Sequence, residues 1–150
     1  MRGVKLGAKM RVGYAMALFA LLLFCAVAVG PAPVTAGRWA YIDVIGAPGD
    51  GKEALERALG DQLNDRGFGV AGTPRAEGFE IQGLVRLFPA GRGEETIRID
   101  WTVFGPDGLR LGNVTQTNLI PKGALNGRWG SMAEAAASAA AQDIMQYIAP

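Results

Sequence analysis

The apolar positions after residue 37 repeat mainly with the period of β-strands. In residues 79–88 (FEIQGLVRLF) and 96–104 (TIRIDWTVF), apolar and polar side chains alternate. Such alternation is typical of antiparallel strands with one buried face and one solvent-exposed face. Residues 38–45, 68–72 and 109–120 are predicted as further strands, because β-branched and aromatic residues are frequent in them.

Two segments have the period of an α-helix instead. In residues 52–65, Leu55, Leu59 and Leu63 fall on one apolar stripe. Residues 131–149 are rich in alanine, a strong helix former with a small side chain. We therefore predict one helix after the first strand and a second helix at the end of the chain.

The ends of these helices carry capping patterns. Asp50 is followed three residues later by Glu53, and Ser131 by Glu134, as in a capping box. Asp50 and Ser131 are therefore expected to cap the two helices with their side chains. Gly67 is expected to end the first helix in the left-handed conformation.

The resulting order of elements, β-α-β-β-β-β-α, predicts an α+β fold. Two amphipathic helices must bury their apolar stripes, so we expect a two-layer sandwich with both helices packed on one face of a mostly antiparallel sheet. Trp101 falls on the apolar side of its strand and is expected in the core. The other face of the sheet is expected to carry Arg, Asp, Gln and Thr side chains toward water or a partner.

Residues 1–36 have the composition of an export signal. A basic start precedes a long uncharged, apolar stretch and the small-residue sequence PAPVTA. We expect a signal peptide cleaved before Gly37 or, since residues 12–30 are long enough to span a bilayer, an N-terminal membrane anchor. Either way, residues 37–150 are expected to form an exported domain, free in the periplasm or anchored to the inner membrane and facing the periplasm.

Cys25 is the only cysteine and lies within this apolar stretch. Lipoprotein processing would acylate such a residue, but Phe24 is larger than the small residue that precedes a processed cysteine. We therefore favour Cys25 as a small apolar residue of the signal over a lipidated one.

The charge and residue types of the exported part limit its chemistry. Four of the 15 basic residues precede residue 37, so the exported part carries 11 basic and 14 acidic residues, a net charge of −3. A mildly acidic domain argues against nucleic acid as a partner. It has no histidine and no cysteine, which removes the usual nucleophile–base pairs and imidazole ligands. We expect no enzyme, no metal and no cofactor.

One stretch resembles a phosphate-binding loop. Gly46 and, after four residues, Gly51 and Lys52 match most of the G-x-x-x-x-G-K-[ST] pattern, but Glu53 stands at the hydroxyl position. The charge of Asp50 would also oppose a phosphate. We interpret the stretch as a tight strand-to-helix turn and expect no nucleotide.

A polar strand and a following loop provide the candidate binding surface. The sequence GNVTQTN contains Asn113, Thr115, Gln116 and Asn118, and the loop before the last helix contains Arg128 and Trp129. One interpretation of the strand is an exposed edge; the other is a hydrogen-bonding surface or an edge for strand addition by a partner. Trp129 is favoured as a staple of the last helix over an exposed contact.

Several stretches resemble a known group of proteins. IDVIGAPGDG, IDWTVFGPDG and GNVTQTN with GALNGRWG are similar to sequences of uncharacterised alphaproteobacterial envelope proteins, many of which have lipoprotein features. The resemblance implies an envelope location but no activity and no binding residues. At the level of the fold, the predicted arrangement is similar to the lipopolysaccharide-assembly lipoprotein and to auxiliary lipoproteins of envelope ABC transporters, which are non-enzymatic partners of larger machines.

These observations lead to two functional hypotheses. The first is a non-catalytic periplasmic or membrane-tethered interaction or assembly module that binds an envelope protein. The alternative is a small periplasmic ligand-binding protein for a sugar or a lipid headgroup.

Overall fold

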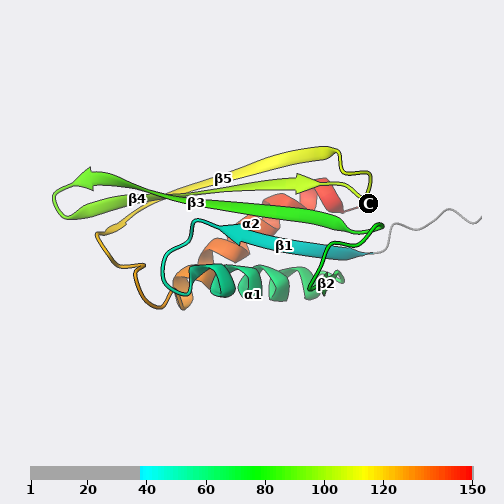
Figure 1. The fold of residues 1–150 in the computed structure, drawn as a ribbon, viewed down its shortest axis with the longest axis horizontal. Coiled ribbons are helices and arrows are strands. Elements are labelled where there is room, and N and C mark those ends of the chain that lie inside the picture. Colours follow the sequence, from blue (N-terminus) through cyan, green and yellow to red (C-terminus); the bar gives the residue numbers. More distant parts are fainter. Residues whose placement is uncertain (1–37, 150) are drawn as a thin grey trace, which may run out of the picture. The chain divides into compact units, whose positions relative to one another are not determined.

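The computed structural model describes residues 38–149 of the chain (Figure 1). The expected signal or anchor in residues 1–36, with Cys25, lies outside the described residues. Neither helix between residues 38 and 149 is long and apolar enough to cross a membrane.

The order of the elements confirms the predicted α+β fold. The chain forms seven elements in the order β1 (Trp39–Ile45), α1 (Gly51–Asn64), β2 (Gly69–Ala71), β3 (Phe79–Gly91), β4 (Glu94–Phe104), β5 (Arg110–Pro121) and α2 (Ser131–Ile148). The helices and the first two strands lie within two residues of their predicted bounds, whereas the hairpin of β3 and β4 is longer at its turn than predicted.

The sheet is mixed, and most of its paired residues are antiparallel, as expected. Its strand order is β2-β1-β3-β4-β5. β1 runs parallel to both β2 and β3, and only the β3–β4 and β4–β5 pairs are antiparallel. The reason lies in α1, because a helix between two strands returns the chain to the end at which it started and so allows parallel pairing.

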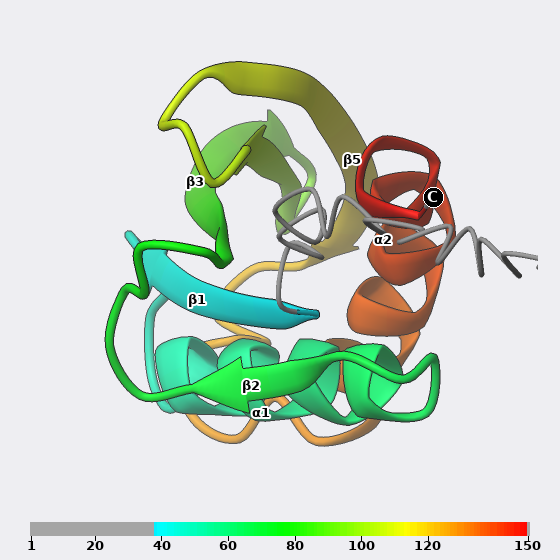
Figure 2. The same cartoon turned by 90° about the vertical axis from the view of Figure 1, so that its right-hand side faces the viewer.

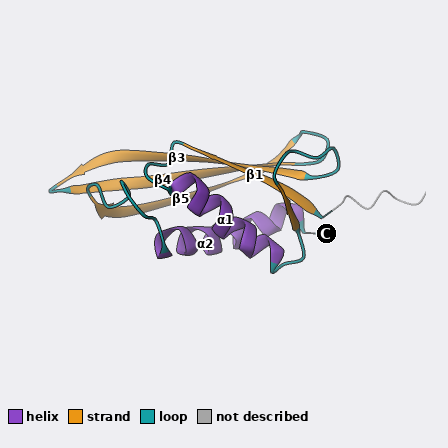
Figure 3. Cartoon of the chain, turned by 60° about the horizontal axis from the view of Figure 1, so that its bottom comes forward, coloured by secondary structure: helices purple, strands orange, loops and turns teal. Residues whose placement is uncertain are grey.

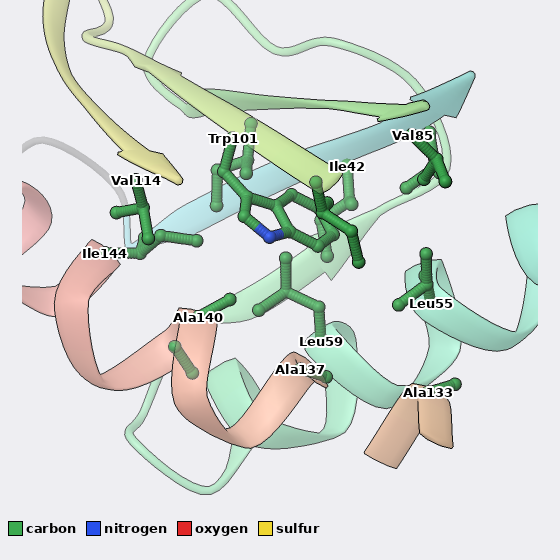
Figure 4. Packing of buried hydrophobic residues seen from close by; sticks show 14 of the residues in the cluster. Ile42, Leu55, Leu59, Val85, Trp101, Val114, Ala133, Ala137, Ala140 and Ile144 are labelled. Carbon is green, nitrogen blue, oxygen red and sulfur yellow. The ribbon is translucent and has the colours of Figure 1, made fainter. Parts of the chain in front are cut away.

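Both helices cover one face of the sheet (Figure 3). Viewed along the strands, the sheet curves from β1 to β5, with α1 next to β1 and β2 and with α2 next to β5 (Figure 2). Trp101 points from β4 toward the two helices and is fully buried among Leu59, Ala137 and Ile144 (Figure 4). The predicted core position of Trp101 is confirmed.

The β3–β4 hairpin projects beyond the helices at one end of the molecule (Figure 1). Arg92 and Gly93 form its turn with φ angles of 53° and 78°. Positive φ at both turn residues matches the right-handed twist of a hairpin. The short turn explains why β3 and β4 are longer than the alternation alone indicated.

The predicted side-chain caps are wrong. Asp50 does precede α1, but neither it nor Gly130, the residue before α2, makes a side-chain capping hydrogen bond. Ser131 is instead the first residue of α2. The left-handed conformation of Gly67 after α1 is confirmed, with φ of 84°.

Candidate functional site

The two glycine-rich loops that the sequence singles out lie against each other. The main-chain N–H of Asp50 donates to the carbonyl of Gly127 over 3.2 Å. In return, the Asp50 Oδ1 accepts a hydrogen bond from the main-chain N–H of Trp129 over 2.9 Å. The indole Nε1 of Trp129 donates to the carbonyl of Pro48 over 2.8 Å. We call this contact between residues 46–51 and 126–130 the loop junction.

The loop junction explains why Trp129 is not an exposed contact. Its side chain is only 2% exposed, so it cannot belong to a partner-binding surface, and its place in the candidate surface is corrected. The ring packs on Gly51, where a side chain would not fit. Trp129 lies just before α2 and belongs to the core, as a hydrophobic staple residue does.

Lys52 joins α1 to β1. Its Nζ lies 2.6 Å from Asp43 Oδ1 and 2.7 Å from Glu56 Oε1, and it donates to the Val44 carbonyl over 3.1 Å. The hydrogen bonds that Lys52 donates to Asp43 and Glu56 raise its pKa above the ordinary value of a lysine. The lysine of the phosphate-loop-like pattern is therefore engaged in ion pairs that hold the first turn of the helix to the strand.

The candidate residues of β5 lie on both faces of the sheet. Asn113 and Thr115 stand on the open face, where Thr115 Oγ1 donates to Asp100 Oδ1 over 2.7 Å. Gln116 and Asn118 face the helix layer instead and line a small apolar cavity next to α2. Because side chains of a strand alternate between faces, the four residues cannot form one surface, which corrects the sequence-based grouping.

Gln116 has a structural position within the helix-covered layer. Its Oε1 accepts from the indole Nε1 of Trp101 over 3.0 Å, and its Nε2 donates to the carbonyl of Ala136 over 2.9 Å. Gln116 thus links the central tryptophan of the sheet to α2.

Arg128 lies away from the open face. It lines a polar hollow between the two helices together with Arg57, Asp61 and Glu134. Of the six candidate residues, only Asn113 and Thr115 remain on the open face of the sheet.

That open face carries a hollow with a volume of about 670 Å³. Its charged lining residues are Asp43, Arg86, Arg98, Asp100 and Arg110. Both helices lie on the opposite face of the sheet (Figure 3). The expectation of a solvent-exposed face of the sheet with Arg, Asp, Gln and Thr side chains is confirmed.

Asp100 is the centre of the polar network on this face. Its Oδ2 lies 2.9 Å from Arg98 Nε and 3.7 Å from Arg86 Nη1. The Asp100 side chain is 15% exposed, and its hydrogen bond with Arg98 lowers the pKa of its carboxyl below the ordinary value. The carboxylate therefore stays ionised at all neutral and mildly acidic pH values.

Sequence reasoning missed Arg86 and Arg98 as candidate residues. They are Cα partners on the neighbouring strands β3 and β4. The turn at Arg92 and Gly93 pairs Gly91 with Glu94 and by itself would place residue 86 opposite residue 99. A bulge between Pro89 and Gly91 shifts the register by one residue, so that Arg86 lies opposite Arg98, and the alternation along the chain did not reveal this bulge. Strict alternation along β5 would also have grouped Asn113 and Thr115 with Thr117 instead of Gln116.

The comparisons with known proteins identify no family. No family model matches the chain, and no curated protein is similar to it. Several solved structures match the chain, among them two at low sequence identity. One is described as an uncharacterized protein, with 15% identity, a TM-score of 0.41 and coverage of 72% of this chain and 86% of the other. The second is a minor lipoprotein from Acinetobacter baumannii, with 15% identity, a TM-score of 0.39 and coverage of 75% and 92%.

Proposed function

We propose that this protein is a non-catalytic interaction module of the bacterial cell envelope that engages an envelope component through the open face of its sheet. The observation that carries the proposal is the hollow of about 670 Å³ on that face. Its size lies within the range of about 300–1,000 Å³ that is usual for ligand sites. The export-type composition of residues 1–36 supports a periplasmic place of action, free or anchored to the inner membrane.

The charges on the open face favour binding over proton transfer. General acids and bases work best with a pKa near the working pH. The hydrogen bond between Arg98 and Asp100 lowers the pKa of Asp100 and raises the pKa of Arg98, so both pKa values move away from neutral pH. Permanently charged, hydrogen-bonded groups are suited to recognising a charged component rather than to moving a proton.

Site-specific photo-cross-linking in living bacterial cells tests the proposal. A photoreactive amino acid replaces Thr117, which is exposed on the open face of β5, or Ser138, which is exposed on α2. We expect the Thr117 position to give a discrete adduct of the full chain with an envelope component and the Ser138 position to give none. Equal adducts from both positions, or an adduct from Ser138 alone, would contradict the assignment of the open face.

A further inference from the structure

We propose that Arg86 and Arg98 on the open face bind the phosphate headgroup of an anionic lipid, and that Phe88 and Leu119 contact the start of its hydrocarbon chain. This inference rests on the proposed function, because it names the chemistry of the component that the open face engages.

The two arginines form a like-charge pair. They occupy directly opposite positions on β3 and β4, an arrangement that is unfavourable for two cations on one face of a sheet. One carboxylate, Asp100, lies between them. A single negative charge leaves one positive charge of the pair uncompensated, which an anionic ligand would balance.

Asp100 also fixes the orientation of Arg98, while N–H donors of both arginines remain available to a ligand. Arg98 binds it through both Nε and Nη2, at 2.9–3.0 Å, so the plane of its guanidinium is fixed. Thr115 donates to the same carboxylate over 2.7 Å. The remaining N–H groups of Arg98, and those of Arg86, belong to side chains that are 45% and 50% exposed. A planar guanidinium presents paired donors that match the oxygens of a phosphate.

The opposite end of the hollow is less suited to an anion. There, the Asp43 carboxylate lines the hollow. It binds Lys52 Nζ, which also binds Glu56, so the three groups carry one net negative charge. Arg110 also lines the hollow, where its Nη2 donates to Asn113 Oδ1 over 3.2 Å. The charge distribution therefore favours an anion beside the arginines over one beside Asp43, and Arg86 and Arg98 are the arginines on the two strands of the projecting hairpin.

Apolar side chains border the arginines on the same face. Phe88 follows Arg86 by two residues on β3, and Leu119 follows Thr117, the Cα partner of Arg98, by two residues on β5. Their side chains are 45% and 57% exposed. Exposed apolar groups beside a cationic pair fit an amphiphile with a phosphate head, whereas free phosphate or an acidic peptide would gain little from them.

Native mass spectrometry of the full chain in a neutral detergent tests this inference. The probes are dihexanoyl phosphatidic acid, dihexanoyl phosphatidylcholine and a glutamate-rich peptide, and binding of inorganic phosphate is followed by thermal unfolding. We expect one phosphatidic acid per chain and weaker binding of the other three probes. Arg86→Gln is expected to weaken phosphatidic acid binding by about tenfold or more, the effect of losing a charge-assisted hydrogen bond.

The variants have matched controls. Arg57→Gln removes the same charge from the exposed face of α1 and is expected to change the affinity less than about twofold. Phe88→Gln is expected to weaken phosphatidic acid binding several-fold, whereas Leu109→Gln, at an exposed apolar residue in the turn before β5, leaves it unchanged. Arg86 is exposed and 3.7 Å from its carboxylate, so its replacement leaves the fold intact.

The inference is overturned if Arg86→Gln binds phosphatidic acid like the unaltered chain. It is also overturned if inorganic phosphate, phosphatidylcholine or the acidic peptide binds as tightly as phosphatidic acid. A protein adduct from the cross-linking position Thr117, without phosphatidic acid binding, would support the proposed function and reject the lipid. Absence of both the adduct and lipid binding would reject both.

Discussion

Replacement of Gly51 by alanine tests the loop junction directly. Gly51 is the first residue of α1, and alanine there would ordinarily favour the helix. In this chain, however, the added methyl group would lie 2.5 Å from Nε1 and 2.7 Å from Cζ2 of Trp129. The indole cannot easily move away, because it is buried and donates to the carbonyl of Pro48 over 2.8 Å.

Two opposing effects determine how much Gly51→Ala changes the free energy of unfolding. Gly→Ala inside a helix stabilises by at most about 1 kcal/mol, and overpacking of a filled core costs about 1–3 kcal/mol. Since Gly51 is only at the first helical position, the helical gain is small and overpacking prevails. We expect Gly51→Ala to lower the free energy of unfolding by about 1–2 kcal/mol, or to lower the Tm by roughly 5–10 °C for a domain of this size.

Urea and thermal unfolding, followed by far-ultraviolet circular dichroism, measure this change. Gly127→Ala is the matched control, because the same substitution at this other junction glycine meets open space and is expected to be neutral or slightly stabilising. A double-mutant cycle with Trp129→Leu isolates the contact. The added methyl fills space that the smaller side chain leaves, so the double variant should be more stable than the sum of the two single changes. Equal or greater stability of Gly51→Ala, or strict additivity in the cycle, would refute the reasoning.

Three further predictions concern the polar groups. Asp100→Asn should lower the free energy of unfolding by about 1–2 kcal/mol, because Arg98 loses a charge-assisted hydrogen bond. Since folding lowers the pKa of Asp100, its stabilisation is complete above its ordinary pKa of 3.8 and is lost as the pH falls through the folded value; urea titrations of the Asn variant should lack this acid dependence. Gln116→Leu should cost about 1–3 kcal/mol, because it leaves the indole N–H of Trp101 without its acceptor. Lys52→Met should cost less than about 1 kcal/mol, as for other exposed ion pairs, and calorimetry should detect no micromolar ATP binding before or after this change.

Each of these predictions has a control or a contrary outcome. Asp143→Asn, at an exposed position of α2, should not change the acid dependence. Thr117→Ala, next to Gln116 but exposed on the other face, should leave the stability within about 0.5 kcal/mol. Tight ATP binding that is lost with Lys52 would show that the glycine-rich turn is a nucleotide site after all.

Those parts of the fold that depend on a pattern within one segment of the chain could be predicted from the sequence. The two-residue period of β3 and β4 and the leucine stripe of α1 gave the right elements, because each pattern records which face of one element is buried. The core position of Trp101 followed from the same alternation. Pairing direction is not contained in such patterns, so the parallel neighbours of β1 could not be read from the chain.

The candidate site was predictable as a face but not as a set of residues. Alternation correctly gave the open face its Arg, Asp and Thr side chains. That Arg86 lies opposite Arg98 depends on the register of the hairpin, which the turn at Arg92 and the bulge between Pro89 and Gly91 set together. The capping pattern at Asp50 failed for a related reason, because its carboxylate binds the main chain of Trp129, 79 residues further along.

The loop junction has a consequence for the order in which the chain folds. It joins the turn after β1 to the loop before α2, across separations of 79 and 81 residues. Contacts between segments so distant require most of the chain to be arranged first, whereas the β3–β4 hairpin closes through its own short turn. We therefore expect the junction to form after the main folding barrier, so that changes within it accelerate unfolding and leave the folding rate nearly constant. The glycine-rich turn that resembles a phosphate loop would then determine the unfolding rate, and therefore the lifetime of the folded chain.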